Sequence, residues 1–153
     1  MGGDLPQLNP ATDKQASPSF IVWANKDSEG ANLDRIQVIK GWYKDGQLEE
    51  KIYNVAVSDN RVIQADGSVA AIEAPVNMET GAWDRSKGAV SLQTVWKDPD
   101  FDPASSAFYY LRVLEIPTAR YTLWDKIRHG VTYPDRAALT TQERAWTSPI
   151  WYN

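Results

Sequence analysis

Three aspartates stand at alternate positions in the stretch KDPDFDP, at Asp98, Asp100 and Asp102. On an extended chain alternate side chains point to the same side, so the three carboxylates would face one ligand. Hard cations such as calcium prefer oxygen clusters of this kind, which makes these residues a candidate metal site. Pro99 and Pro103 interrupt the run, however, and the glycine of an EF-hand loop is missing. We therefore favour a solvated turn in which Asp102 caps a short helical turn begun by Pro103.

Aromatic side chains are the second group that could bind a ligand, because the chain has seven tryptophans and seven tyrosines. Rings gathered on one exposed face of a sheet would stack on sugar rings, with neighbouring polar side chains fixing the hydroxyl groups. The candidates at expected strand ends or in loops are Trp42, Tyr43, Trp83, Trp124 and Tyr133. The alternative, which we favour, is that the aromatics fill the core and a seam with a neighbouring domain, since each buries a large apolar area.

Arg112 lies among apolar residues in the run FYYLRVLEI. A charge buried there would need a partner, and Glu115, Asp125 and Glu143 are the candidates. The guanidinium would alternatively point outward and bind a phosphate or carboxylate, so Arg112 is also a candidate ligand-binding residue. We favour the ion pair, since buried charges are normally paired.

Catalysis has little support in the residue types of the chain. The one histidine, His129, would serve as a general acid or base, but no serine stands in a G-x-S-x-G context. We favour a helix cap or a surface position for it. The absence of cysteine excludes disulfides, thiolate metal sites and a cysteine nucleophile, and catalytic zinc usually needs two or three histidines. The sequence therefore predicts no catalytic residue.

Length and charge exclude further classes of function. A chain of 153 residues forms one domain with a sizeable core. The net charge of −4 argues against a nucleic-acid partner, which would require a basic surface. No apolar run is long enough to span a membrane. The first residues lack the features of a signal peptide, so any export signal of the parent protein is expected upstream and the compartment is left open.

Turn signals divide the chain into short strand-like runs. Residues 33–58 alternate in two runs joined by Asp45-Gly46, which predicts a β-hairpin with a primed turn. Residues 107–116 are apolar on both faces, as in a central strand. Residues 121–131 show helical spacing before Gly130 and predict a short helix. Further strands are expected within 19–27, 90–98 and 140–152, the last with Trp146 and Tyr152 on one face.

These elements predict an all-β fold, an antiparallel β-sandwich of immunoglobulin-like type with long irregular insertions and one short helix. Glycine, proline and small polar residues at 1–18 predict a linker, followed by a β-sandwich domain over 19–153. A terminal strand held by sheet pairing would also explain why the chain ends on large aromatic residues.

Three stretches together resemble a known family: ANLDRIQVIKGW, VWKDPDFDPASSAFYYLRVLEIPTARYTLWD and TTQERAWTSPIWYN. They are similar to the C-terminal end of the bacterial domain-of-unknown-function 3604 family. Its longer members carry an upstream region similar to PHP-type metal-dependent phosphoesterases. In those proteins, several histidines and carboxylates of the upstream domain hold the divalent metals. With one histidine here, the resemblance implies a C-terminal domain without its own metal site or cofactor.

The function expected from the sequence is therefore that of an accessory domain. It would pack against the upstream catalytic domain of the same polypeptide, with the oligomeric state left open. The alternative is a sandwich module that binds carbohydrate or another ligand. A self-contained enzyme ranks last, because the chain lacks cysteine and has one histidine.

Overall fold

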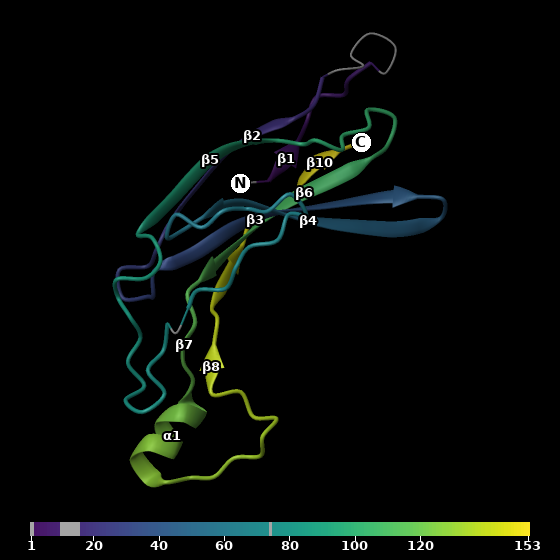
Figure 1. Cartoon of the computed structure of the whole chain (residues 1–153). Coiled ribbons are helices and arrows are strands. Elements are labelled where there is room, and N and C mark those ends of the chain that lie inside the picture. Colours follow the sequence, from purple (N-terminus) through teal and green to yellow (C-terminus); the bar gives the residue numbers. More distant parts are fainter. Residues whose placement is uncertain (1, 10–15, 74) are drawn as a thin grey trace.

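The computed structural model describes residues 2–9, 16–73 and 75–153 (Figure 1). Residues 1 and 10–15 of the predicted linker lie outside the described residues. The elements in chain order are β1 (Gly3–Asp4), β2 (Ser19–Asn25), β3 (Leu33–Lys44), β4 (Gln47–Val57), β5 (Ser91–Lys97), β6 (Ala107–Glu115), β7 (Thr118–Ala119), α1 (Tyr121–His129), β8 (Thr140–Thr141), β9 (Arg144–Trp146) and β10 (Ile150–Tyr152).

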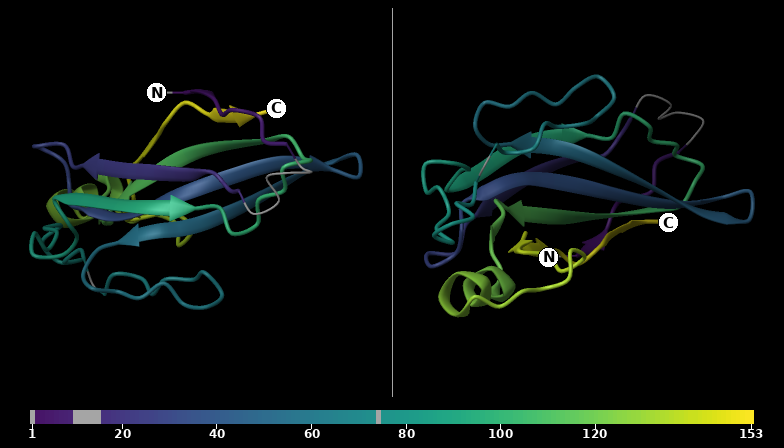
Figure 2. Two further views of the ribbon diagram at one scale, coloured as in Figure 1. Left: turned by 90° about the horizontal axis from the view of Figure 1, so that it is seen from above. Right: turned by 60° about the horizontal axis from the view of Figure 1, so that its bottom comes forward.

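The strands form two layers of unequal size. The larger sheet has six strands in the order β1-β10-β6-β3-β4, with β9 also paired to β6. Strands β2 and β5 form a separate antiparallel pair that lies over part of this sheet, as Figure 2 shows from above. Every pairing between these strands is antiparallel except β1 with β10. The predicted all-β, sandwich-like fold is confirmed.

The β3–β4 hairpin forms where the alternation predicted it. Lys44 pairs with Gln47, and the two residues between them have positive φ angles, 50° at Asp45 and 82° at Gly46. These are the angles of a type I′ turn, whose twist matches that of the strands it joins. Strand β6 pairs with the opposite edge of β3 and is therefore a central strand, as its apolar character predicted.

The core fills the space between the two layers. Ile36 and Val38 point from β3 toward the smaller sheet and are at most 1% exposed. They meet Val22 and Leu92 from β2 and β5 in one cluster, and Tyr109 from β6 in another. Large aromatic side chains complete the second cluster: Phe20, Tyr53, Trp96 and Tyr109, with ring centroids 4.9–6.4 Å apart.

Helix α1 lies at one end of the molecule, where the β7–β8 pair carries it away from the larger sheet (Figure 1). It ends as predicted, at Gly130, which takes the left-handed conformation with φ 65°. The amides of Gly130 and Val131 donate to the carbonyls of Lys126 and Asp125. A bilayer span needs about 20 apolar helical residues, whereas the helix found in the described ranges has nine.

The segment 140–152 forms three short strands, β8, β9 and β10, rather than the single strand predicted. Trp146 in β9 lies opposite Arg112, and Tyr152 in β10 lies opposite Ala107. Pro149 stands between the strands, where it supplies no amide hydrogen to a ladder. β9 and β10 meet β6 in registers that differ by one residue, so Trp146 and Tyr152 do not share a buried face: Trp146 is 56% exposed and Tyr152 3% exposed.

Part of the N-terminal segment is paired with the larger sheet. Gly3 and Asp4 form the parallel strand β1 beside Ile150 and Trp151 of β10. Leu5 continues the contact, since its amide donates to the Trp151 carbonyl at 2.7 Å and its side chain packs on the core. Strands β1 and β10, from opposite ends of the described sequence, therefore lie side by side at one edge of the larger sheet (Figure 2).

Replacing Gly41 by alanine should destabilise the larger sheet. Gly41 pairs with Phe108, and a β-carbon at position 41 would collide with the Phe108 ring. Overpacking of this kind costs about 1–3 kcal/mol, so the urea midpoint should fall by the corresponding amount. The same substitution at Gly67, where a β-carbon would meet nothing within 4 Å, tests backbone strain alone because φ is 80° there. A Gly41→Ala protein as stable as the wild type would contradict this packing.

Candidate functional site

The aspartates of KDPDFDP are held by separate partners rather than gathered around one point. Asp98 is buried, and its carboxylate lies 2.6 Å from the Lys40 ammonium. The Tyr109 hydroxyl donates to the same carboxylate at 2.8 Å, and the Asp100 amide donates to its other oxygen at 2.9 Å. The prediction of a fully solvated turn was therefore wrong for Asp98, because Lys40 reaches it from the middle of β3.

The other two aspartates are more exposed. The Asp100 carboxylate accepts hydrogen bonds from the Lys51 ammonium and, at 2.7 Å, from the Tyr53 hydroxyl. These donors lower the pKa of Asp100. Asp102 caps a turn as predicted, by accepting from the Ala104 amide at 2.9 Å.

None of the three carboxylates of this stretch is left without a cation or a donor. Within residues 2–9, 16–73 and 75–153, no group of three or more acidic or histidine side chains could hold a metal ion. The arrangement thus closes one end of the sandwich with a network of paired charges. Each carboxylate has its own protein partners, so the geometry favours this structural role.

Two tyrosines of this network, buried Tyr109 and half-buried Tyr53, should make the fold sensitive to alkaline pH. Burial, together with the hydrogen bonds to Asp98 and Asp100, raises the pKa of Tyr109 and of Tyr53 well above the ordinary value. The unfolded chain releases these protons at about pH 10 while the folded chain retains them. Their contribution to stability is therefore fully present below about pH 10 and is lost as the pH rises further.

The free energy of unfolding, measured in urea between pH 8 and 11, should consequently fall above about pH 10. Tyr109→Phe should be less stable at pH 8, because Asp98 loses a donor, and should show a shallower alkaline fall. Tyr43→Phe, at a 65% exposed position, is the control and should follow the wild-type curve. Equal slopes for Tyr109→Phe and the wild type would refute the assignment.

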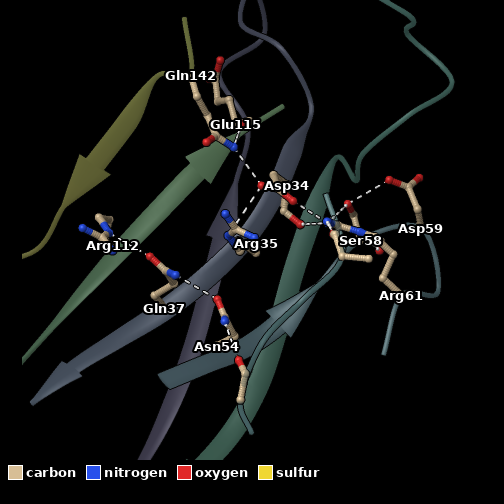
Figure 3. Close-up of polar contacts among 12 residues, drawn as sticks. Asp34, Arg35, Gln37, Asn54, Ser58, Asp59, Arg61, Arg112, Glu115 and Gln142 are labelled. Carbon is tan, nitrogen blue, oxygen red and sulfur yellow. Dashed lines mark hydrogen bonds and ion pairs between the residues drawn. The ribbon is translucent and has the colours of Figure 1, made fainter. Parts of the chain in front are cut away.

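Arg112 is held by an amide rather than by a carboxylate. Its Nε donates to Gln37 Oε1 at 2.8 Å, Gln37 donates to Asn54, and Asn54 donates to the Gly67 carbonyl (Figure 3). The expected ion pair with Glu115, Asp125 or Glu143 is not formed. The reason is the register, because Arg112 lies directly opposite Gln37 across the β3–β6 pair.

A second polar network, centred on buried Asp34, ties the segment after β4 to the sheet. The Asp34 carboxylate contacts the Arg61 guanidinium and accepts from Gln142 Nε2 at 2.8 Å (Figure 3). Arg61 donates in turn to the Ser58 and Ala70 carbonyls. Sequence reasoning missed this network, because nothing in the local pattern relates positions 34, 61 and 142.

The predicted aromatic residues do not meet in one platform. Trp42 and Tyr43 lie near the tip of the β3–β4 hairpin, whereas Trp124 is on α1, at the far end of the molecule (Figure 1). Tyr133 follows the helix and donates to Asp125 at 2.7 Å. Trp83 lies in the loop before β5, with the Arg85 guanidinium 5.7 Å from its ring centroid. Carbohydrate binding through these residues stays a prediction.

Strands β2 and β5 expose apolar side chains that nothing in the described part of the chain covers. Strand β2 buries alternate residues and exposes the others, so that Ile21 is 87% and Trp23 67% exposed. On β5, Val95 lies opposite Ile21 and is 70% exposed. We call Ile21, Trp23 and Val95 the β2–β5 surface. Contiguous exposed apolar side chains of this kind mark interaction sites.

The open edge of β2 adjoins this surface. The Asp98 amide donates to the Pro18 carbonyl and the Lys26 amide to the Val90 carbonyl, so the even positions of β2 bond to β5. In an antiparallel ladder the odd positions then direct their N–H and C=O groups away from β5. Among the described residues, β2 pairs with β5 alone. Its outer edge therefore offers unpaired backbone groups, which proteins usually cover.

A cavity of about 240 Å³ lies beside that edge, because the larger sheet extends beyond β2. Its walls are mostly apolar and come from β2, β6 and the segment before β10. They include Phe20, Tyr109, Leu111, Thr147 and Ile150. The continuous apolar run FIVWA was the signal for this region, since apolar residues on both faces of a strand are typical of one covered on both sides.

These features define an all-β, sandwich-like domain with an uncovered apolar surface on its smaller sheet. The chain belongs to the family described as protein of unknown function (DUF3604), whose model matches residues 1–153. No curated protein and no solved structure matches it. The family named on the three quoted stretches is thereby confirmed.

Proposed function

We propose that this domain is a non-catalytic accessory module of a PHP-type metal-dependent hydrolase. It would pack through the β2–β5 surface against the catalytic domain of the same polypeptide. The observation that carries the proposal is the exposure of Ile21, Trp23 and Val95 side by side on the smaller sheet. The resemblance of the quoted stretches to the C-terminal end of longer proteins supports the identity of the partner.

The energetics favour burial of this surface against another domain. A tryptophan side chain alone buries about 150–250 Å² when covered. At about 25 cal/mol per Å² of apolar area, covering Trp23 and its neighbours would supply several kcal/mol. The unpaired edge of β2 would gain backbone partners in the same step.

The divalent metals implied by the resemblance would belong to the partner domain. The donors present here do not fit them, because the described carboxylates form no cluster and His129 is exposed on α1. The role proposed for this chain is to position and shield the neighbouring domain. Its own side chains take no part in the chemistry.

Binding can be tested by mixing this chain with the separately produced upstream domain of a longer family member. Calorimetry should give saturable binding with one copy of each. Trp23→Asp should weaken it at least tenfold, because a charge would be buried in the interface. Val62→Asp is the matched control, since Val62 is 66% exposed but lies outside the β2–β5 surface.

Two results would contradict the proposal. One is no binding, or equal binding by both variants. The other is that the isolated chain self-associates, that Trp23→Asp abolishes this self-association, and that adding the upstream domain does not change it. The β2–β5 surface would then be the interface of a homodimer.

A further inference from the structure

A second cavity lies at the end of the sandwich that carries the loops and α1. Its volume is about 370 Å³, within the range of small-molecule sites. It lies between the turn after β2 and the loop before β5, and it is lined by Lys26, Ser28, Glu29, Gly30, Asn32, Trp83 and Arg85. Unlike the cavity beside β2, its walls are mostly polar.

Two cations of this lining are held in place without an acidic partner. The Lys26 ammonium donates to the carbonyls of Gly30 at 2.8 Å and Asp27 at 2.9 Å. The Arg85 guanidinium lies against the Trp83 ring, at 5.7 Å from its centroid. In the described part of the chain, neither cation lies within ion-pair distance of a carboxylate.

The loops that carry these cations are braced by hydrogen bonds. Asn32 Nδ2 donates to the carbonyls of Arg85 and Lys87, at 3.0 and 2.8 Å, which joins the two walls of the cavity. Asp84 accepts from the Ser86 amide and hydroxyl, so its carboxylate closes its own turn. Asp27 likewise accepts from the Glu29 amide. Glu115, whose carboxylate lies beside Gly30, accepts from the Ala31 amide at 3.2 Å. Three of the four nearby carboxylates therefore accept hydrogen bonds from the protein.

We propose that this cavity binds the oxyanion group of a small ligand, a phosphate or a carboxylate. A guanidinium held over an indole by a cation–π contact keeps its donors free for bidentate bonds to such a group. Lys26 adds a second fixed positive charge. The lining also contains one acidic residue, Glu29, which disfavours ligands of high negative charge. We therefore expect a ligand with a single oxyanion group. The inference is independent of docking through the β2–β5 surface.

Nuclear magnetic resonance titration tests the site on the whole chain, with inorganic phosphate, acetate and glucose as probes. Phosphate or acetate should shift the Trp83 indole N–H resonance saturably, and glucose should not. Arg85→Gln should weaken the binding at least tenfold. Arg128→Gln is the matched control, because the Arg128 guanidinium also lies over a tryptophan ring, at 4.7 Å from the Trp124 centroid, but outside the cavity.

The arms of the titration separate the possible sources of the oxyanion. Saturation by phosphate alone assigns a phosphoryl ligand, and saturation by acetate assigns a carboxylate. Three results would overturn the proposal. The shift could rise linearly, without saturation, for both phosphate and acetate; Arg85→Gln and Arg128→Gln could have equal effects; or glucose could bind in place of the anions.

Discussion

Replacing Asp98 by alanine is expected to lower the free energy of unfolding by about 3–5 kcal/mol, as observed when one partner of a buried ion pair is removed. The Lys40 side chain is 5% exposed and would lie in the core without its carboxylate partner. The Tyr109 hydroxyl would lose its acceptor in the same change. Since domains of this size have a total stability of about 5–15 kcal/mol, much of the fold's stability would be lost.

Urea unfolding followed by tryptophan fluorescence measures the effect. Asp102→Ala is the control from the same stretch and should cost about 1 kcal/mol, the usual value of a capping residue. The double variant Lys40→Met/Asp98→Leu should recover most of the loss, because apolar side chains can replace a buried pair. Equal stability of Asp98→Ala and Asp102→Ala would show that Lys40 does not depend on Asp98.

Asp34→Asn is expected to have the second-largest effect, a loss of about 3 kcal/mol. The change keeps the shape of the side chain but removes the charge that faces the Arg61 guanidinium, which is 11% exposed. Arg61 also donates a hydrogen bond to the Ala70 carbonyl at 2.8 Å. If Arg61 loses its ion pair with Asp34, the segment that follows β4 should therefore open more often.

Hydrogen exchange adds a local readout to the unfolding experiment. Amides of residues 61–70 should exchange faster in Asp34→Asn, while those of the β3–β6 pair change little in the folded state. Asp135→Asn, an exposed substitution outside the network, should leave both measurements unchanged. Unchanged exchange over 61–70 in Asp34→Asn would mean that the network of Figure 3 does not anchor this segment.

Local patterns were enough to predict most of the fold. Alternation and Asp45-Gly46 define the hairpin, and Gly130 defines the end of the helix. Pairing between distant segments was not predictable in the same way. The predicted last strand is divided because β8 pairs with β7, and because β9 and β10 meet β6 in registers that differ by one residue. These long-range pairings are not encoded in the alternation within 140–152.

The candidate sites show the same limit. KDPDFDP stood out as an acidic run, but the ion pair of Asp98 with Lys40 joins the end of β5 to the middle of β3. Trp83 was identified as a candidate by residue type alone. Its cavity depends on Asn32 bridging to the loop before β5, a contact between residues more than 50 positions apart.

The two proposed surfaces lie in different regions of the molecule. The β2–β5 surface covers the outer side of the smaller sheet, whereas the oxyanion cavity lies between loops at the end near α1. A partner domain on the first surface would leave side chains of the second, such as Arg85, free to bind a ligand. The two proposals can therefore fail or succeed separately.

Hydroxyl-radical footprinting of Trp23 tests the accessory role most directly. The oxidation rate would be compared between this chain alone and the same domain within a longer polypeptide that carries the upstream hydrolase region, with Trp146 as the internal reference because it is 56% exposed on a different strand. The expected result is strong protection of Trp23 in the longer polypeptide and no change at Trp146. Equal oxidation of Trp23 in both proteins would contradict packing through the β2–β5 surface.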